Sequence, residues 1–258
     1  MDLKQHFWEI DFLRGIAILT MVFYHLLYNL HFFARYPINV YTGFWMYFAR
    51  VTATLFIFLV GVSLSLSFSR AKHFPSTSSS ERRLFLKYLI RGVKIFFWGM
   101  VITLVTWFFL REGFVIFGVL HLIGLSIILA FPFLKLEPKF NYVNLLIGIF
   151  FVFLGAYLKK FIFDFPWLLW LGFRPEQFYT VDYFPLFPWF GAVLIGIFSG
   201  NLLYPDYSRR FSLPDLSCRK EIKVLSFLGK HSLLIYLLHQ PLIIALLYLL
   251  GMVKVNLF

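Results

Sequence analysis

The sequence predicts an all-α membrane protein, a polytopic bundle of about seven transmembrane helices (range 7–8). Of its 258 residues, 60% are hydrophobic and 14% are charged, whereas a soluble globular domain carries roughly 25% charged residues. The mean hydropathy is +0.80. Apolar stretches of about 18 to 22 residues recur along the whole length, each long enough to cross a ~30 Å hydrocarbon core as a helix. We therefore expect a single integral membrane domain over residues 1–258.

Seven such stretches follow one another, and each predicts one membrane-spanning helix. They are Phe12 to Phe33, Phe44 to Phe68, Tyr88 to Phe109, Val115 to Leu134, Tyr142 to Leu158, Pro185 to Tyr204 and Phe227 to Gly251. The further apolar segment 161–170 is interrupted by Asp164 and Pro166 and contains Trp167 and Trp170. Tryptophan is enriched at membrane–water interfaces, so this segment is expected to lie at the outer surface and not to span.

The basic residues predict the orientation of the chain. The formal net charge is +12, from 24 lysines and arginines against 12 acidic residues. If the N-terminus is cytoplasmic, seventeen of the 24 fall on that side and seven on the other. This asymmetry follows the positive-inside rule, so we expect a cytoplasmic N-terminus, a multi-pass protein of the cell membrane, and no nucleic-acid partner.

Cysteine and glycine content limit the other possibilities. The only cysteine, Cys218, lies in a predicted cytoplasmic loop, so we expect no disulfide and no metal site. Glu9 and Asp11 stand where a cleavable signal peptide would have a basic region, so we expect no such peptide. Small residues let membrane helices approach closely, and those of segment 185–204 would permit a homodimer.

Three histidines lie inside three different predicted spans. With 1.5 Å of rise per residue, His25 and His121 come to lie roughly 21 Å from the cytoplasmic face and His239 roughly 18 Å. Arg50 reaches the same layer. A titratable group in hydrocarbon is costly and marks a functional candidate. No Asp or Glu falls in the middle of any predicted span, so histidine would have to carry any proton transfer there.

Five blocks of sequence, in order along nearly the whole chain, resemble one family. They are WEIDFLRGIAILTMVFYH over Trp8 to His25, LFIFLVGVS from Leu55, FGVLHLIG from Phe117, YFPLFPWFG from Tyr183 and LGKHSLLIYLLHQP from Leu228. The first resembles the first-helix signature of transmembrane acyltransferases. The ordered set is similar to the prokaryotic branch related to heparan-α-glucosaminide N-acetyltransferase.

The resemblance implies transfer of an acetyl group from cytoplasmic acetyl-CoA, as acyl donor, to an amine or hydroxyl acceptor across the membrane, usually on a sugar or glycolipid. His25 would be the general base or a transient acyl carrier, with His121 and His239 as further catalytic candidates. Arg50 could stabilise the developing oxyanion, and Asp182 could bind the acceptor. Arg14, Arg91 and Lys94 belong to a basic inner rim that could hold the phosphates of the donor.

Other interpretations stay open at this point. Each histidine alone could be a satisfied helix–helix hydrogen-bonding residue, Arg14 could pair with Asp11, and Arg91 and Lys94 could serve topology alone. The main alternative function is a transporter or channel in which histidines and Arg50 relay protons or bind an anion. Saturable binding of acetyl-CoA at the cytoplasmic face would distinguish the enzyme from the transporter.

Overall fold

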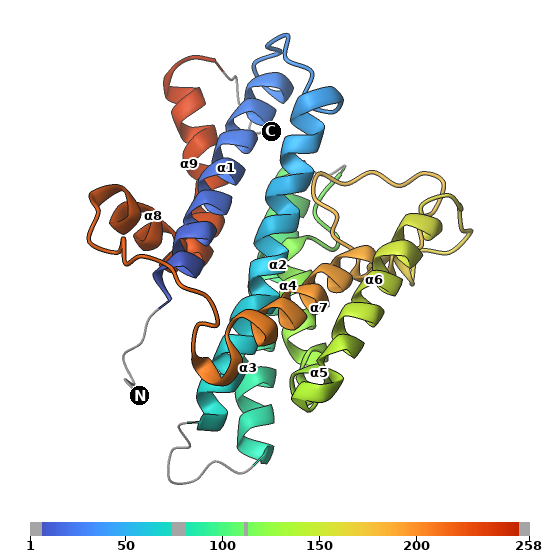
Figure 1. Ribbon diagram of the computed structural model, residues 1–258. Helices are drawn as coiled ribbons and strands as arrows, with labels where there is room; N and C mark the ends of the chain where they lie inside the picture. Colours follow the sequence, from blue (N-terminus) through green and yellow to red (C-terminus); the bar gives the residue numbers. More distant parts are fainter. Residues whose placement is uncertain (1–6, 74–80, 111–112, 253–258) are drawn as a thin grey trace. The chain divides into compact units, whose positions relative to one another are not determined.

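The computed structural model describes residues 7–73, 81–110 and 113–252, and most of them are helical (Figure 1). No strand forms within these ranges; an isolated parallel bridge joins Phe117 to Tyr183. Six helices are long and apolar enough to cross a membrane. They are α1 (Trp8–Phe32), α2 (Gly43–His73), α3 (Glu81–Leu110), α6 (Asn141–Leu158), α7 (Leu186–Leu203) and α9 (Ser232–Leu249). With the shorter apolar helix α4 (Val119–Leu129), they confirm the predicted polytopic all-α class.

The predicted span Val115 to Leu134 is divided into two helices. α4 is followed by the four-residue α5 (Phe131–Leu134), which has Pro132 in its first turn. Proline has no amide hydrogen and is tolerated in the first turn of a helix but not in its interior, so the chain starts a new helix here. At 1.5 Å per residue, α4 is about 16 Å long, well short of a ~30 Å hydrocarbon core.

The C-terminal span also differs from its prediction, which placed its start at Phe227. A separate amphipathic helix, α8, covers Lys220–Lys230, and a single residue, His231, lies between it and α9. α8 lies mostly within the loop that contains Cys218 and was predicted to be cytoplasmic. Its buried residues, Ile222, Ser226 and Gly229, recur at three- to four-residue spacing, which is the pattern of a surface helix packed on one side.

The chain divides into two compact units. The first contains residues Met1–Leu59 and Leu213–Phe258, and the second Val60–Ser212. In the first unit, α1 packs against α8 and α9 (Figure 1). A Cβ atom on Gly15 would overlap the carbonyl oxygen of Leu225, and one on Gly229 would overlap that of Asp11. The two glycines therefore let the backbones of α1 and α8 touch.

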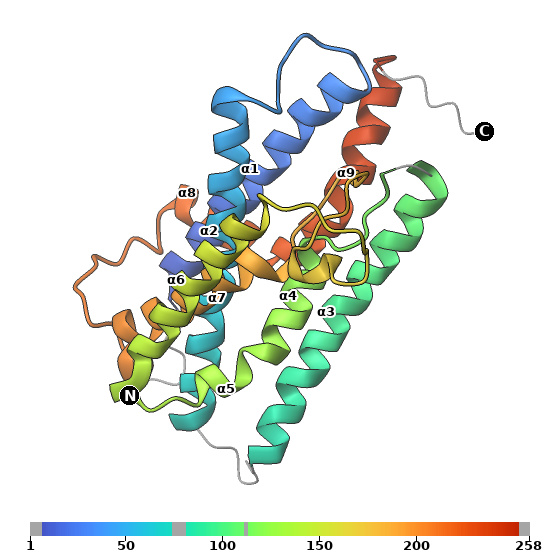
Figure 2. The same cartoon turned by 90° about the vertical axis from the view of Figure 1, so that its right-hand side faces the viewer.

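The second unit is built from helix pairs that also meet at glycines. α3 packs against α4 and α6 against α7 (Figure 2). A Cβ on Gly148 would lie 2.9 Å from the carbonyl oxygen of Gly191, and one on Gly191 would lie 2.5 Å from that of Gly148. Gly124 approaches the backbone of Gly92 in the same way. Small residues at these positions permit close helix contact, which was predicted for segment 185–204 and is present there at Gly191.

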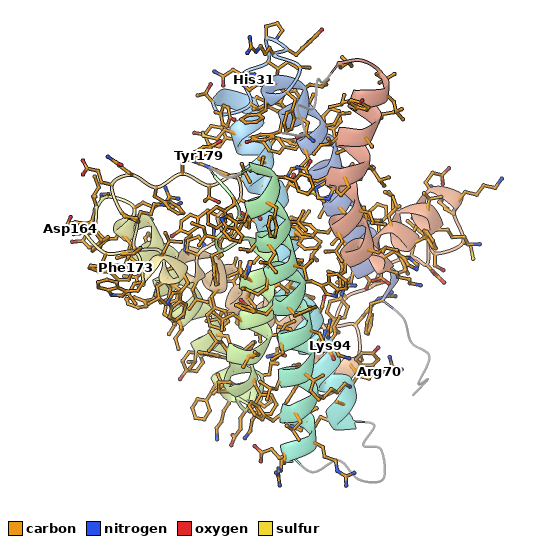
Figure 3. The ribbon with its side chains drawn as sticks, turned by 180° about the vertical axis from the view of Figure 1, so that it is seen from behind. His31, Arg70, Lys94, Asp164, Phe173 and Tyr179 are labelled. Carbon is orange, nitrogen blue, oxygen red and sulfur yellow. The ribbon has the colours of Figure 1, made fainter. Side chains whose placement is uncertain are left out.

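Between α6 and α7 runs a long loop that contains a short 3-10 helix, η2 (Leu169–Leu171), and no spanning helix, as predicted for segment 161–170. Its aromatic side chains pack against one another. The ring centroids of Phe163 and Phe173 are 4.7 Å apart and those of Phe165 and Trp167 are 5.3 Å apart. Figure 3 shows Asp164 and Phe173 together in this loop.

Candidate functional site

His25 of α1 and His239 of α9 lie together in the first unit. Their ring centroids are 4.8 Å apart, and the planes meet at 67° in an edge-to-face arrangement. The two residues are 214 positions apart in the sequence, and the packing of α1 on α9 brings them together. Two of the three histidines that were predicted to lie at similar depth are therefore neighbours.

Both rings are held by carbonyl groups of their own helices. The Nδ1 atom of His25 lies 2.9 Å from the carbonyl oxygen of Met21, and the Nδ1 atom of His239 lies 2.5 Å from that of Tyr236. A carbonyl oxygen only accepts hydrogen bonds, so each Nδ1 must carry the proton. In both neutral rings the lone pair is then on Nε2, which is the atom that can accept a proton from a substrate.

The Nε2 atom of His239 is buried without a partner among the described residues. The side chain is 7% exposed. A buried acceptor without a hydrogen bond costs about 1–3 kcal/mol, so its presence needs an explanation. Orphaned acceptors of this kind are found where a ligand or a transferred proton supplies the missing donor.

A second polar contact holds the pair from one side. Asn29 lies one turn beyond His25 on α1 and is 1% exposed. Its Nδ2 atom donates a 2.7 Å hydrogen bond to Oε1 of Gln240, the residue after His239. Pro241 follows inside α9 and leaves the carbonyl of Leu237 without its helical amide partner. The sequence reasoning missed Asn29 and Gln240. The four-residue spacing from His25 and the adjacency to His239 are the signals that could have found them.

His121 belongs to the second unit and has a different hydrogen-bonding pattern. Its Nδ1 atom accepts the amide hydrogen of Gly118 at 3.2 Å, so its proton lies on Nε2, 3.4 Å from Oγ1 of Thr103. The ring is 2% exposed and packs 5.1 Å from the ring of Phe96. Both ring nitrogens therefore have hydrogen-bond partners. The ring caps the N-terminus of α4, because it binds the amide of Gly118, the residue just before the helix. This geometry supports a capping role, and the catalytic role of His121 stays a prediction.

Asp182 also lies at the N-terminus of α4. Its Oδ2 atom accepts the amide hydrogen of Val119 at 3.3 Å. The carboxylate is held there because segment 180–184 runs beside segment 113–118, with hydrogen bonds from Val181 N to Gly113 O and from Phe184 N to Phe117 O. A carboxylate at a helix N-terminus is favourable because the macrodipole is positive there. Binding of an acceptor by Asp182 stays a prediction.

Next to Asp182, Tyr183 forms a contact that the sequence reasoning missed. Its hydroxyl donates to the carbonyl oxygen of Leu169 at 2.7 Å, and the guanidinium of Arg174 lies 4.9 Å from its ring centroid. Burial raises the pKa of Tyr183 to about 12, although Arg174 acts in the opposite direction. The phenol is therefore a neutral hydrogen-bond donor that ties the long loop to the start of α7.

The sequence model of the family described as heparan-alpha-glucosaminide N-acetyltransferase, catalytic, matches residues 6–241. The chain belongs to this family. No curated protein and no solved structure matched the chain. Membership confirms the resemblance of the five sequence blocks, and with the six apolar helices it makes the chain an integral membrane protein of an acetyltransferase family.

The basic residues predicted to bind the donor or to act in catalysis differ in their surroundings. Arg14 forms a 2.8 Å ion pair with Asp11, so the pairing considered for it is present. Arg50 is exposed, and its carbonyl oxygen accepts a hydrogen bond from Oγ1 of Thr54. Arg91 and Lys94 are exposed on α3, where Figure 3 shows Lys94 on the first half of the helix. Their roles toward donor and acceptor remain predictions.

Proposed function

We propose that this protein is a transmembrane acetyltransferase that moves the acetyl group of cytoplasmic acetyl-CoA to an amine or hydroxyl acceptor, a sugar or glycolipid, on the opposite side of the membrane. The observation that carries the proposal is the pair of His25 and His239, whose Nε2 lone pairs are free because both Nδ1 protons are held by backbone carbonyls. Family membership supports the same reaction class.

In the direct route, Nε2 of His25 removes the proton of the acceptor as its nitrogen or oxygen adds to the thioester carbonyl. The tetrahedral intermediate expels the thiolate of CoA, which takes the proton back from the imidazolium. The hydrogen bond from Nδ1 to Met21 keeps the ring oriented in both states. In the alternative route, Nε2 of His25 itself attacks the thioester, and the acetyl-imidazole is then transferred to the acceptor.

Charged residues supply the remaining parts of the proposal. Arg50, on α2 in the same unit, is the proposed donor to the oxyanion. Arg14, Arg91 and Lys94 are proposed to hold the phosphates of acetyl-CoA, since guanidinium and ammonium groups bind phosphate oxygens through charge-assisted hydrogen bonds. Asp182 is the proposed contact for the acceptor.

The test compares His25→Ala, His239→Ala and the double variant with His31→Ala. His31 lies on the same helix but points its Nδ1 toward the carbonyl oxygen of Tyr36 outside the pair. Loss of a general base typically lowers a rate by about 10²–10⁴-fold. We expect that loss for His25→Ala, with acetyl-CoA binding and thermal stability close to wild type, and no loss for His31→Ala.

Labelled acetyl-CoA without acceptor separates the two routes. Radioactive acetyl that stays on denatured wild-type protein but not on His25→Ala would establish the acyl-histidine, and absence of label would favour direct transfer. Turnover of His25→Ala near wild type would contradict the assigned base. If the wild-type protein shows no saturable acetyl-CoA binding, the transporter alternative replaces the enzyme.

A further inference from the structure

Helix α8 has two different faces. Ile222, Ser226 and Gly229 are buried, and Ser226 donates from Oγ to the carbonyl oxygen of Trp8 on α1. The opposite face, at helical spacing, consists of Lys220, Lys223, Val224, Phe227 and Lys230, all exposed. Val224 and Phe227 are each 59% exposed, although they are apolar. This face therefore presents two exposed apolar side chains, with Lys220 and Lys223 before them along the helix and Lys230 after them.

The positive charge of this face comes from three lysines, Lys220, Lys223 and Lys230. None of the three lysines forms an ion pair with the described part of the chain. The only acidic residue of α8, Glu221, is exposed beside them. Arg219 precedes the helix and adds a further positive charge. Uncompensated cations around apolar side chains fit a partner that is negatively charged at its surface and apolar beneath it.

The place of α8 along α1 matches the headgroup layer of a membrane. α8 contacts Trp8, Asp11 and Gly15 of α1, which span about 10 Å at 1.5 Å per residue. The same stretch holds Glu9 and the ion pair of Asp11 with Arg14. Since α1 has 25 residues, about 37 Å, it exceeds a ~30 Å hydrocarbon core, and its charged first turns extend beyond that core.

α8 is also joined closely to both histidine-bearing helices. Gly15 and Gly229 bring it into backbone contact with α1, and His231 alone separates it from α9. A ligand that fixes α8 therefore restrains the starts of α1 and α9, whose packing places His25 beside His239. Figure 1 shows α8 beside the starts of both helices.

We propose that the face of α8 formed by Lys220, Lys223, Val224, Phe227 and Lys230 is a binding site for the headgroups of anionic phospholipids. Val224 and Phe227 enter the boundary between headgroups and acyl chains, and the lysines pair with phosphate oxygens. Occupancy of the site holds α8, and through it the starts of α1 and α9. This last consequence for turnover rests on the proposed acetyltransferase function, whereas lipid binding itself does not.

The binding test uses the sole cysteine, Cys218, which is free, exposed and two residues before Lys220. The full chain is labelled there with a fluorophore in neutral detergent and titrated with spin-labelled phosphatidylglycerol, which quenches the fluorophore on close approach. The variant Lys220→Gln/Lys223→Gln/Lys230→Gln removes the charge, and Lys220→Arg/Lys223→Arg/Lys230→Arg is the matched control that keeps it.

A lysine near an anionic surface contributes roughly a fivefold gain in affinity, so the triple Gln variant should bind phosphatidylglycerol roughly 100-fold more weakly. The Arg control should stay within about threefold of wild type. Val224→Ser/Phe227→Ser should also weaken binding, with charge unchanged. Equal quenching of wild type and the Gln variant, or quenching of wild type by spin-labelled phosphatidylcholine as strong as by phosphatidylglycerol, would overturn the proposal. Full competition by inorganic phosphate would overturn it too, since the site would then bind free anions.

Turnover is measured separately in nanodiscs of phosphatidylcholine alone and with phosphatidylglycerol. We expect several-fold higher acetyl transfer with the anionic lipid for wild type and the Arg control, and no such gain for the Gln variant. Lipid binding without any acetyl transfer would refute the enzymatic function and leave the lipid site standing. Transfer that ignores lipid charge would refute the coupling of α8 to the histidine pair.

Discussion

Substitutions of His121 can show whether this residue caps helix α4 or takes part in catalysis. The ring accepts the amide hydrogen of Gly118 through Nδ1, as a glutamine at the same third helical position does in a capping box. His121→Gln can therefore restore the acceptor, whereas His121→Phe keeps a ring but has no acceptor. If the role is structural, the glutamine variant should stay within about 1 kcal/mol of wild-type stability and keep its acetyl transfer.

The cost of His121→Phe follows from two contacts. The amide of Gly118 loses its acceptor in a buried place, which costs about 1–3 kcal/mol. The larger ring also has little room, because a Cβ built on Gly99 would already lie 3.0 Å from the imidazole, and overpacking costs about 1–3 kcal/mol. We expect a total loss of about 2–6 kcal/mol. Thr103 keeps its 2.7 Å bond to the carbonyl oxygen of Val115 and changes little.

Unfolding in detergent, followed by tryptophan fluorescence, measures the stability of both variants. Acetyl transfer is measured per folded molecule at a temperature where each variant is folded. A His121→Gln protein that is as stable as wild type but transfers acetyl roughly 100-fold more slowly would refute the capping argument and place His121 in catalysis.

Three further predictions concern other parts of the chain. Replacing both Arg91 and Lys94 with Gln should weaken acetyl-CoA binding several-fold at low salt, and the difference in affinity from wild type should shrink at high salt. Unchanged affinity, measured by calorimetry, would mean that the two residues serve only to orient the chain in the membrane. A double-mutant cycle on Asn29→Ala and Gln240→Ala should give a coupling of about 1 kcal/mol in unfolding, and additive losses would speak against their hydrogen bond. Burial raises the pKa of Tyr183 from 10.0 to about 12, so between these pH values the folded protein keeps a proton that the unfolded chain has lost. The free energy of unfolding should therefore fall as the pH rises from 10 to 12, and Tyr183→Phe should lack this contribution to the pH dependence.

Hydropathy alone predicted the long helices because a hydrocarbon core requires continuous apolar length with every backbone group bonded inside the helix. It failed at Pro132 and at His231, where local chemistry divides an apolar run. The start of α9 was placed at Phe227 because that residue is apolar, but it lies on the exposed face of α8. The three- to four-residue spacing of Ile222, Ser226 and Gly229 would have indicated the separate helix.

The candidate site was predictable only in part. Residue type and depth suffice to select His25 and His239, since an imidazole in hydrocarbon is costly wherever it points. The same reasoning selects His121, whose nitrogens are engaged by Gly118 and Thr103. The histidines differ in the partner of Nδ1. In His25 and His239 this atom faces a backbone carbonyl, whereas in His121 it accepts a backbone amide hydrogen. That depends on side-chain direction and loop path, neither of which residue spacing specifies.

The hydrogen bonds to Met21 and Tyr236 decide what the pair can do. Each neutral ring gives its only proton to its own helix, so neither can donate to the other, and together they present two acceptors and no donor. Protonation of one ring adds an Nε2–H donor beside the second ring, whose centroid lies 4.8 Å away. Residues that act as a unit have non-additive effects, so the double variant should cost little more than the worse single one.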